Sequence, residues 1–152
     1  MRFIADAMLG RLARWLRFLG FDTLYYPDIS DGRLIRIARE QDRFILTRDT
    51  RLVKRKGLNN YLLINANNSF KQLFQVLDTL KIRRFKPLSR CVACNGQLSQ
   101  ISDKTEVKDL VPEYVFLHYK VFFRCNDCGK IYWEGSHPRK FKEKLVDILK
   151  KE

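Results

Sequence analysis

The sequence predicts an α/β protein with a small parallel sheet and flanking helices, followed by a four-cysteine zinc ribbon. Within residues 1–86, short apolar runs alternate with amphipathic segments, which is the pattern of right-handed βαβ units. All four cysteines come later in the chain, in two C-x-x-C pairs. Because 152 residues suffice for one compact domain and one small metal-stabilised module, we expect domains at residues 1–86 and 87–152.

The hydrophobic periodicity of the first domain gives the order of its elements. Gly20 ends the first helix, and Ser30 and Ser69 are expected N-cap residues for the two later helices. A short helical turn at residues 52–56 stops at Gly57. We expect strands at residues 2–6, 21–26, 44–47 and 61–64, and helices at residues 8–19, 30–41 and 69–80.

The residues after the first domain differ from it in composition and in hydrophobic pattern. Residues 83–90 are basic, contain Pro87 and lack apolar periodicity, so we expect a linker there. Residues 114–124 and 130–134 are rich in aromatic and β-branched side chains, which predicts strands flanking the second cysteine pair. A last basic helix is expected to begin at Pro138.

The cysteine pairs, Cys91 with Cys94 and Cys125 with Cys128, predict a structural zinc site. Each C-x-x-C turn can point both sulfurs at one ion, and the Asn-Gly or Gly that follows supplies a positive-φ residue. A redox pair or two disulfides are the alternatives. Disulfides need an oxidising compartment, whereas residues 1–20 carry arginines among apolar residues and no clean signal peptide. We therefore expect a cytoplasmic protein with reduced, zinc-binding thiols.

The charge of the chain favours an anionic partner. Its formal net charge is +13 and its pI is about 9.9, so nucleic acid is the leading partner. A solvated basic surface and an anionic membrane face are the alternatives. Lys or Arg interrupts every hydrophobic stretch before the roughly twenty residues that a bilayer span requires, so we expect no membrane segment.

Three aspartates are candidate catalytic residues because of where the predicted elements place them. Asp6 ends the first strand, Asp49 follows the third strand within L-T-R-D, and Asp31 opens the helix after the second strand. Ligands of an open parallel sheet bind beyond the carboxyl ends of its strands. Three carboxylates meeting there would repel one another unless a cation lay between them, which favours Mg²⁺ or Mn²⁺ and the activation of water against phosphate.

Each acid also has a structural explanation. Asp31 lies in a first helical turn, where the helix dipole favours an acid, and Asp49 could cap the turn that follows it. Asp6 is harder to explain, because a carboxylate between an apolar strand and a helix is costly to bury unless it is paired or binds a cation. Asp28, in the loop before the second helix, is an alternative to Asp31 that spacing does not separate.

A specific order of motifs runs along the chain. It comprises M-R-F-I-A-D, G-R-L-A-R-W-L-R-F-L-G-F-D-T, S-D-G-R-L-I-R-I-A, R-F-I-L-T-R-D, the paired cysteines and I-Y-W-E-G-S-H. This order resembles the Mut-seven C-terminal RNase domain family over nearly the whole chain. The resemblance implies a PIN-like nuclease domain fused to a zinc ribbon, metal-dependent endoribonuclease activity, and acidic roles for Asp6, Asp31 and Asp49. PIN nucleases commonly carry a further acid after the T-x-D motif, whereas Thr50 and Arg51 stand there in this chain.

Basic and aromatic residues near these positions are the candidate RNA contacts. They are Arg11, Arg14 and Arg17 along the first helix, Arg48 and Arg51 beside Asp49, and Trp133 and His137 in the ribbon. Arginines suit phosphates, and aromatic rings suit the bases of a single strand. The alternatives are a solvated helix face for the arginines and core packing for the aromatic residues. His118 and His137 are left out of the zinc site, which the cysteines complete.

These observations together predict a metal-dependent endoribonuclease. It would hydrolyse RNA phosphodiesters through a carboxylate-held Mg²⁺ or Mn²⁺ site, while the zinc ribbon assists RNA binding. The alternative is a non-catalytic RNA- or ribosome-binding adaptor with a degenerate PIN-like domain, for which Arg51 is the main argument. A third possibility is an α/β domain that docks another protein.

Overall fold

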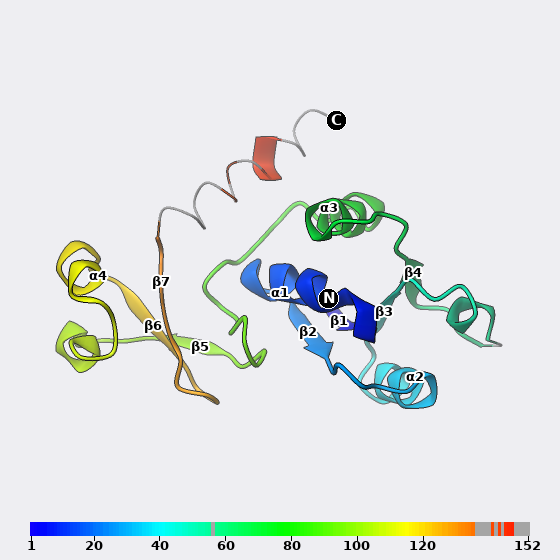
Figure 1. The fold of residues 1–152 in the computed structure, drawn as a ribbon, viewed down its shortest axis with the longest axis horizontal. Coiled ribbons are helices and arrows are strands. Elements are labelled where there is room, and N and C mark those ends of the chain that lie inside the picture. The colour runs from blue at the N-terminus through cyan, green and yellow to red at the C-terminus, as the bar shows by residue number, and fades with distance from the viewer. Residues whose placement is uncertain (56, 136–140, 142, 144, 148–152) are drawn as a thin grey trace.

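The computed structural model describes the chain except for residues 56, 136–140, 142, 144 and 148–152. Its first part contains β1 (Arg2–Ala5), η1 (Ala7–Leu9), α1 (Gly10–Phe18), β2 (Asp22–Tyr25), α2 (Asp31–Glu40), β3 (Phe44–Thr47), η2 (Leu52–Lys54), β4 (Tyr61–Leu63) and α3 (Ser69–Thr79). Its second part contains β5 (Leu98–Gln100), η3 (Lys104–Val107), α4 (Glu113–His118), β6 (Phe122–Cys125) and β7 (Ile131–Trp133). We call β1 to α3 the sheet unit and the segment from Cys91 to Trp133 the ribbon (Figure 1).

The sheet unit is built on a parallel four-stranded sheet with the strand order β2-β1-β3-β4. The chain passes from β1 outward to β2, then returns across β1 to β3, so the strand order reverses between β1 and β3. In open α/β sheets this switch point leaves a crevice at the carboxyl ends of the two strands. Asp6 and Thr47 lie at these ends. The predicted α/β class is therefore confirmed.

Helices cover both faces of the sheet and create two separate cores (Figure 1). Alternate residues of β1 serve the two faces, because successive side chains of a strand point in opposite directions. Phe3 packs with side chains of α1 and α3, such as Leu16 and Leu73. Ile4 packs with side chains of α2, such as Leu34. β1 and β3 are buried on both sides, which explains their continuous apolar sequence.

The predicted N-cap is confirmed at α2 but is wrong at α3, and the helix expected at residues 8–19 begins as the 3-10 turn η1 and continues as α1. The Ser30 hydroxyl accepts a hydrogen bond from the Arg33 N–H at 3.3 Å, as an N-cap should. At α3 the cap is Asn68, whose side-chain oxygen accepts from the Lys71 N–H at 2.8 Å. Ser69, the expected cap, instead accepts a hydrogen bond from the indole N–H of Trp15 at 3.2 Å.

The ribbon is an antiparallel sheet with the order β5-β6-β7. The predicted strand at residues 114–124 is wrong in its first half, which forms the helix α4, and β5 was not expected. Pro112 occupies the N-cap position of α4 and Glu113 lies in its first turn, where an acid is favoured. Tyr114 and Leu117 are each 64% exposed, so these large side chains of α4 lie outside the core.

The C-terminal segment returns to the sheet unit. Residues 141, 143 and 145–147 are helical, and Phe141 and Leu145 are buried in the core beside α1 and α3. The Phe141 ring stacks on Trp15 with 4.2 Å between centroids. The predicted start of this helix, Pro138, lies outside the described residues. In the described part of the chain, no helix has both the length and the apolar character of a membrane span.

Candidate functional site

Asp6 is held at the carboxyl end of β1 by hydrogen bonds from both sides of the switch point. Its carboxylate accepts one hydrogen bond from the Ala7 N–H and one from the Thr47 hydroxyl, each at 2.8 Å. Its own N–H donates to the Leu46 carbonyl at 2.9 Å. The side chain is 8% exposed. Asp6 is thus a nearly buried carboxylate whose hydrogen-bond donors are all neutral.

Thr47 connects Asp6 to Asp49. While its hydroxyl donates to Asp6, the same oxygen accepts from the Asp49 N–H at 3.0 Å. The Asp49 carboxylate then accepts from the Arg51 N–H at 2.8 Å. Thr47 is fully buried, so its hydroxyl has few alternative partners. We did not identify Thr47 as a site residue from the sequence, although its place in the T-x-D motif offered the signal.

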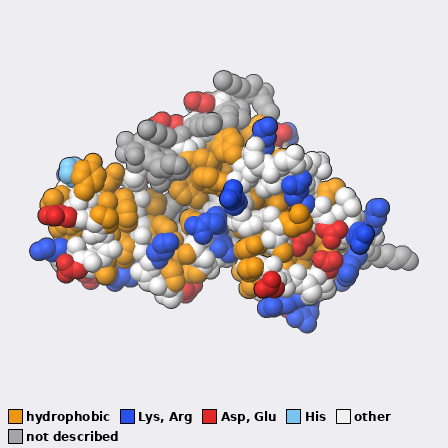
Figure 2. Space-filling model, viewed as in Figure 1, with side chains coloured by type: hydrophobic (Ala, Val, Ile, Leu, Met, Phe, Trp, Pro, Cys, Tyr) orange, Lys and Arg blue, Asp and Glu red, His pale blue; other side chains and the backbone are white. Residues whose placement is uncertain are grey.

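Asp31 lies at the start of α2, and the guanidinium of Arg55 lies 3.8 Å from its carboxylate. The two side chains are 37% and 52% exposed, so solvent weakens this ion pair. Asp28 is exposed in the preceding loop. Figure 2 shows acidic side chains gathered beside the ends of β1 and β3, with Lys and Arg side chains next to them.

The structure joins Asp6 and Asp49 through Thr47 but does not bring all three predicted acids together. In the described part of the chain, only the four cysteines form a group of at least three side chains that could hold a metal ion. Carboxylate oxygens are nonetheless the ligands that Mg²⁺ and Mn²⁺ prefer. The assignment of Asp6, Asp31 and Asp49 to a divalent-cation site stays a prediction.

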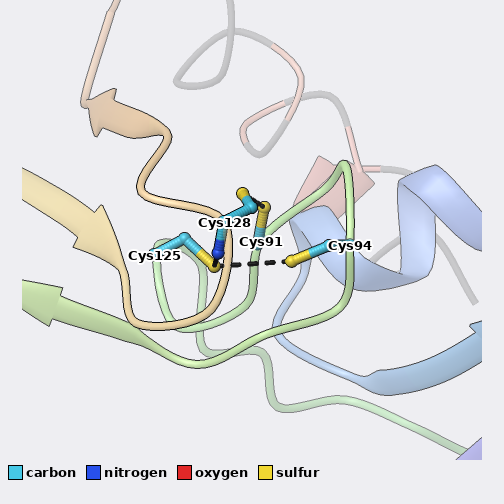
Figure 3. Close-up of side chains that lie close together, drawn as sticks. All are labelled: Cys91, Cys94, Cys125 and Cys128. Atoms are coloured by element: carbon cyan, nitrogen blue, oxygen red, sulfur yellow. Dashed lines mark hydrogen bonds between the residues drawn. The ribbon is translucent and has the colours of Figure 1, made fainter.

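The four cysteine sulfurs all lie within 4.8 Å of one another (Figure 3). The Cys91 and Cys128 sulfurs are 3.6 Å apart, and those of Cys94 and Cys125 are 3.4 Å apart. A tetrahedron with Zn–S bonds of about 2.3 Å has S–S edges of about 3.8 Å, whereas a disulfide bond is about 2.05 Å long. The cysteines are free thiols. Their spacing therefore fits zinc and confirms the predicted cluster.

The two cysteine turns have matching backbone geometry. The Asn95 N–H donates to the Cys91 carbonyl at 2.9 Å, and the Gly129 N–H donates to the Cys125 carbonyl at 3.0 Å. Asn95 and Gly129 have φ values of +71° and +78°, as predicted for residues that close such turns. Gly96 is required for a steric reason instead, because a Cβ there would lie 2.8 Å from the Cys125 sulfur.

Tyr132 supports the metal cluster from β7. Its hydroxyl lies 2.9 Å from the Cys91 sulfur and accepts a hydrogen bond from the Val92 N–H at 3.1 Å. Burial raises the pKa of the Cys91 thiol, but hydrogen bonds from Tyr132 and from backbone N–H groups outweigh it and bring the pKa to about 7. Tyr132 thus favours the thiolate form that binds a metal.

Arg17 differs from its predicted role as an RNA contact. Its side chain is 6% exposed, and burial lowers its pKa. The guanidinium donates to the Thr23 carbonyl of β2 at 2.8 Å, and to the Val92 and Ala93 carbonyls at 3.1 and 3.3 Å. Because these internal acceptors use the guanidinium, Arg17 joins the first cysteine turn to the sheet unit and is not available to phosphates.

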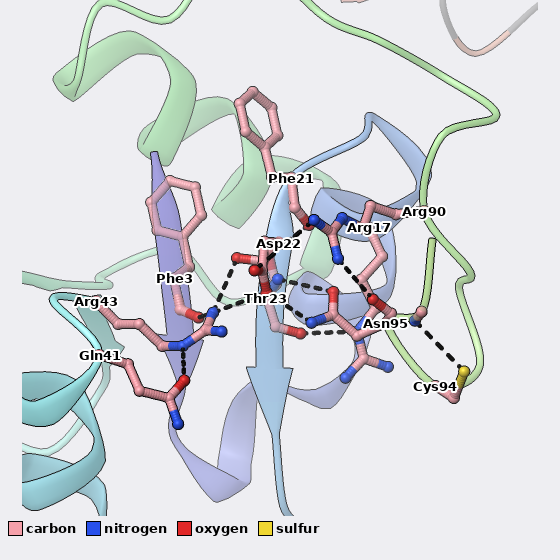
Figure 4. A network of polar contacts seen from close by, with 11 residues as sticks. Phe3, Arg17, Phe21, Asp22, Thr23, Gln41, Arg43, Arg90, Cys94 and Asn95 are labelled. Atoms are coloured by element: carbon pink, nitrogen blue, oxygen red, sulfur yellow. Dashed lines mark hydrogen bonds and ion pairs between the residues drawn. The ribbon is translucent and has the colours of Figure 1, made fainter. Parts of the chain in front are cut away.

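Asn95 makes the second connection between the ribbon and the sheet unit (Figure 4). Its side-chain oxygen accepts from the Thr23 N–H at 2.9 Å, and its amide group donates to the Asp22 carboxylate at 2.7 Å. β2 is an edge strand, so Asn95 and Arg17 satisfy backbone groups that would otherwise lack a neighbouring strand. Arg17 lies on the predicted first helix and Asn95 in a cysteine turn, and no local pattern at either position predicts this contact.

Asp22 is the charged centre of the same network. The buried Arg43 guanidinium donates to its carboxylate at 2.8 Å, and Arg90 lies 3.8 Å away. Burial alone would raise the pKa of Asp22, but the hydrogen bonds from Arg43 and Asn95 outweigh it and hold the pKa below its ordinary value. Asp22 is therefore a structural acid at the contact between the two parts of the molecule.

The other predicted RNA contacts occupy varied environments. Arg11 and Arg14 are exposed and line a hollow of about 360 Å³ between α1, Ser69 and Val92. Arg48 donates to the Asn67 side chain at 3.0 Å, and Arg51 is exposed. Trp133 is partly buried, with its ring 6.3 Å from that of Phe122. His137 lies outside the described residues.

A family comparison covers nearly the whole chain. The family model described as Mut7-C RNAse domain matches residues 1–145, which include both the sheet unit and the ribbon. No curated protein and no solved structure matches the chain at a significant level. The family match therefore agrees with the resemblance inferred from the motifs.

Proposed function

The chain belongs to the Mut7-C RNAse domain family, and from that premise we propose that it is a metal-dependent endoribonuclease. In this proposal Asp6, Asp31 and Asp49 are the catalytic carboxylates and would hold Mg²⁺ or Mn²⁺, and a structural zinc binds the cysteines. Residues 1–86 form the PIN-like nuclease domain. Residues 87–152 form the second domain, whose ribbon assists RNA binding and whose Phe141 and Leu145 pack against the first domain.

The environment of Asp6 is the observation that carries the proposal. Its carboxylate is 8% exposed, and among the described residues no cationic side chain pairs with it. Such a carboxylate is costly to bury without a positive partner. Each oxygen accepts a single hydrogen bond, which leaves lone pairs available for a cation. The position at the β1 and β3 switch point is also where this class of sheet binds its ligands.

The neighbouring residues have distinct tasks in the proposed reaction. Thr47 fixes the orientation of the Asp6 carboxylate, and it also holds the backbone of Asp49. Arg48 and Arg51 flank Asp49 and supply positive charge for an RNA phosphate. Asp6, Asp31 and Asp49 would hold Mg²⁺ or Mn²⁺, which would supply activation of a water molecule and neutralise charge on the phosphate oxygens. The expected products carry a 5′-phosphate and a 3′-hydroxyl.

A cleavage assay with the zinc-loaded full chain tests this proposal. We expect single-stranded RNA to be cut after Mn²⁺ or Mg²⁺ is added, and to stay intact without either ion. Removing a residue that only supports a metal ligand costs about 10- to 100-fold in activity. Asp6→Asn changes a proposed ligand itself, so its activity should fall by more than about 100-fold. Thr47→Val keeps the shape of the side chain and removes the hydroxyl that supports Asp6, so its activity should fall by about 10- to 100-fold.

Asp109→Asn is the matched control, because Asp109 is an exposed acid of the ribbon and the substitution changes the net charge equally. Its activity should equal that of the unmodified chain. Cleavage that survives both Asp6→Asn and Asp49→Asn would contradict the proposal. Products that end in a 2′,3′-cyclic phosphate would also contradict it.

The second candidate is an RNA- or ribosome-binding adaptor without catalysis. Two observations favour it: Arg55 pairs with Asp31, and Arg51 stands after Asp49 where a further acid is common. A chain that binds RNA in a salt-sensitive way but never cuts it, with either ion, would favour this adaptor. Failure to bind RNA at low salt would favour a protein-docking role instead.

A further inference from the structure

A groove of about 530 Å³ runs along the outer side of α2. Its lining comprises Gly32, Ile35, Arg36, Arg39 and Glu40 of α2, together with Arg55 from the segment after η2. Among these described lining residues, three of the six are arginines and Glu40 is the one acid. The groove is therefore a positively charged surface feature that the proposed acidic site does not include.

Arg36 and Arg39 are the two guanidinium groups of the groove that have no partner among the described residues. They are spaced by three residues on α2, so they lie on one face of the helix. Both are exposed, and neither makes a hydrogen bond or an ion pair with other described residues. Their full hydrogen-bonding capacity is available to an external anion. Guanidinium groups bind phosphate oxygens in a two-pronged geometry.

The surrounding backbone leaves space for a ligand and for the Arg39 side chain. A Cβ added to Gly32 would meet no atom within 4 Å, so the helix is open at this position. Gly57 has a φ of +78°, and a Cβ there would lie 3.3 Å from a guanidinium nitrogen of Arg39. Arg39 and Ile35 also line a second hollow of about 250 Å³. The hollowed surface therefore continues past Arg39 toward the β3–β4 connection, where its lining includes Asp42, Asn59 and Asn60.

Arg55 links this groove to the proposed acidic site. It lines the groove and lies 3.8 Å from Asp31, which stands at the start of α2. The ten residues of α2 span about 15 Å, and Arg36 and Arg39 follow Asp31 along the helix. A polyanion held near the proposed acids could thus continue along α2.

We propose that the α2 groove binds the sugar-phosphate backbone of the RNA strand next to the scissile phosphate, with Arg36 and Arg39 each contacting one phosphate. This inference rests on the proposed function and names a binding surface for its substrate. The residues of this surface differ from the arginines of α1 and from those beside Asp49. Phosphates repeat at regular spacing along a strand, which suits two free guanidinium groups on one helix face.

Salt-dependent RNA binding tests the groove separately from cleavage. All chains carry Asp6→Asn, and the probe is a fluorescent single-stranded RNA of about 20 nucleotides in buffer without Mg²⁺ or Mn²⁺. Each phosphate contact on a single strand contributes about 0.7 to the slope of log K against log salt. The double variant Arg36→Gln, Arg39→Gln should therefore have a slope about 1.4 shallower and a weaker affinity at low salt.

The matched control is Lys81→Gln with Arg84→Gln, which removes the same charge. Both residues are exposed and follow α3, which covers the opposite face of the sheet from α2 (Figure 1). A third variant, Gly32→Glu, keeps both arginines and adds an acid to the groove. Because Glu replaces Gly in a first helical turn, thermal stability should rise while RNA affinity falls. A purely structural role would not produce these opposite changes.

The possible results separate the two proposals. A shallower slope for the groove variant alone, with weaker binding by Gly32→Glu, supports the groove. If the slopes of the groove and control variants are equal, the groove proposal is overturned, and cleavage by the unmodified chain still decides the nuclease proposal. If the Asp6→Asn chain binds no RNA at low salt, both the groove proposal and the RNA-directed function are overturned.

Discussion

The sheet unit and the ribbon are stabilised by different means. The sheet unit has apolar cores on both faces of its sheet, and strands such as β1 and β3 contribute to each. In the ribbon, the apolar or thiol side chains that are almost fully buried include only Cys91, Val107, Phe122 and Cys125 among the described residues. A region with so little apolar core depends on its metal ligands.

The contact between the two regions is polar, unlike either interior. Arg17 and Asn95 connect the first cysteine turn to the edge strand β2, and Asp22 brings Arg43 and Arg90 into the same network. Gly20 allows the segment that leads into the ribbon to approach the end of α1, since a Cβ at this residue would clash with the Lys86 carbonyl oxygen. The ordered first cysteine turn therefore provides hydrogen-bond partners for the edge strand β2, so the ribbon contributes to the stability of the sheet unit.

Loss of the metal should have the largest effect, because it should unfold the ribbon and leave the sheet unit folded. A structural zinc contributes on the order of 10 kcal/mol of apparent folding free energy. Cys125→Ser should therefore remove the protection of β5, β6 and β7 against hydrogen exchange, while β1 and β3 stay protected. Hydrogen-exchange mass spectrometry on the purified chain measures both regions at once. Equal loss of protection in the two regions would show that the sheet unit has no independent stability.

Phe141 tests whether the C-terminal segment belongs with the sheet unit. Its ring is 8% exposed and stacks on Trp15. Phe141→Ala should reduce the free energy of unfolding by about 3–5 kcal/mol, because it leaves a cavity against α1 and α3. Urea unfolding followed by tryptophan fluorescence measures the change. The control is Leu117→Ala, at an exposed site of α4, which should change the free energy of unfolding by less than about 0.5 kcal/mol. Equal effects of the two substitutions would contradict the packing of Phe141 against α1 and α3.

Asp22 tests the polar contact. Asp22→Asn should lower the free energy of unfolding at pH 7 by about 2 kcal/mol, the range for hydrogen bonds to a charged group. Because the folded pKa lies below the unfolded value of about 3.9, the stabilisation by Asp22 is complete above that pH and is lost as the pH falls through the folded pKa.

The variant should therefore lose less stability than the unmodified chain below about pH 4. Urea titrations at several pH values compare the two chains. Parallel pH profiles would show that the carboxylate of Asp22 has no special interaction in the folded state.

The smallest expected effect comes from Tyr132, which tests whether its hydroxyl supports the cysteine cluster. Tyr132→Phe removes the hydroxyl that lies 2.9 Å from the Cys91 sulfur. Zinc affinity should fall by about tenfold, as for other partners of metal ligands. Competition with a colorimetric chelator measures it. Tyr114→Phe removes a hydroxyl from the exposed helix α4 and should leave zinc affinity unchanged; an equal fall would assign the effect to general destabilisation.

Local sequence patterns predicted the elements of the sheet unit well. Strands β1 and β3 are buried on both faces, so their apolar runs were clear, and Ser30 was correctly predicted to begin α2. The cysteine cluster was predictable too, because each pair and its positive-φ residue lie within a few positions of one another. The prediction failed at residues 114–118, where aromatic and β-branched residues form a helix after Pro112.

The sequence by itself determined the α/β class, the four-cysteine cluster, and the acids at the strand ends, because each depends on short-range spacing or periodicity. Only the tertiary structure decided the positions of Arg17, Asn95 and Phe141. Arg17 and Asn95 each form hydrogen bonds across more than 70 positions of the sequence, and Phe141 packs on a helix near the N-terminus. Contacts between such distant segments arise when the sheet, its helices and the cysteine turns fold against one another.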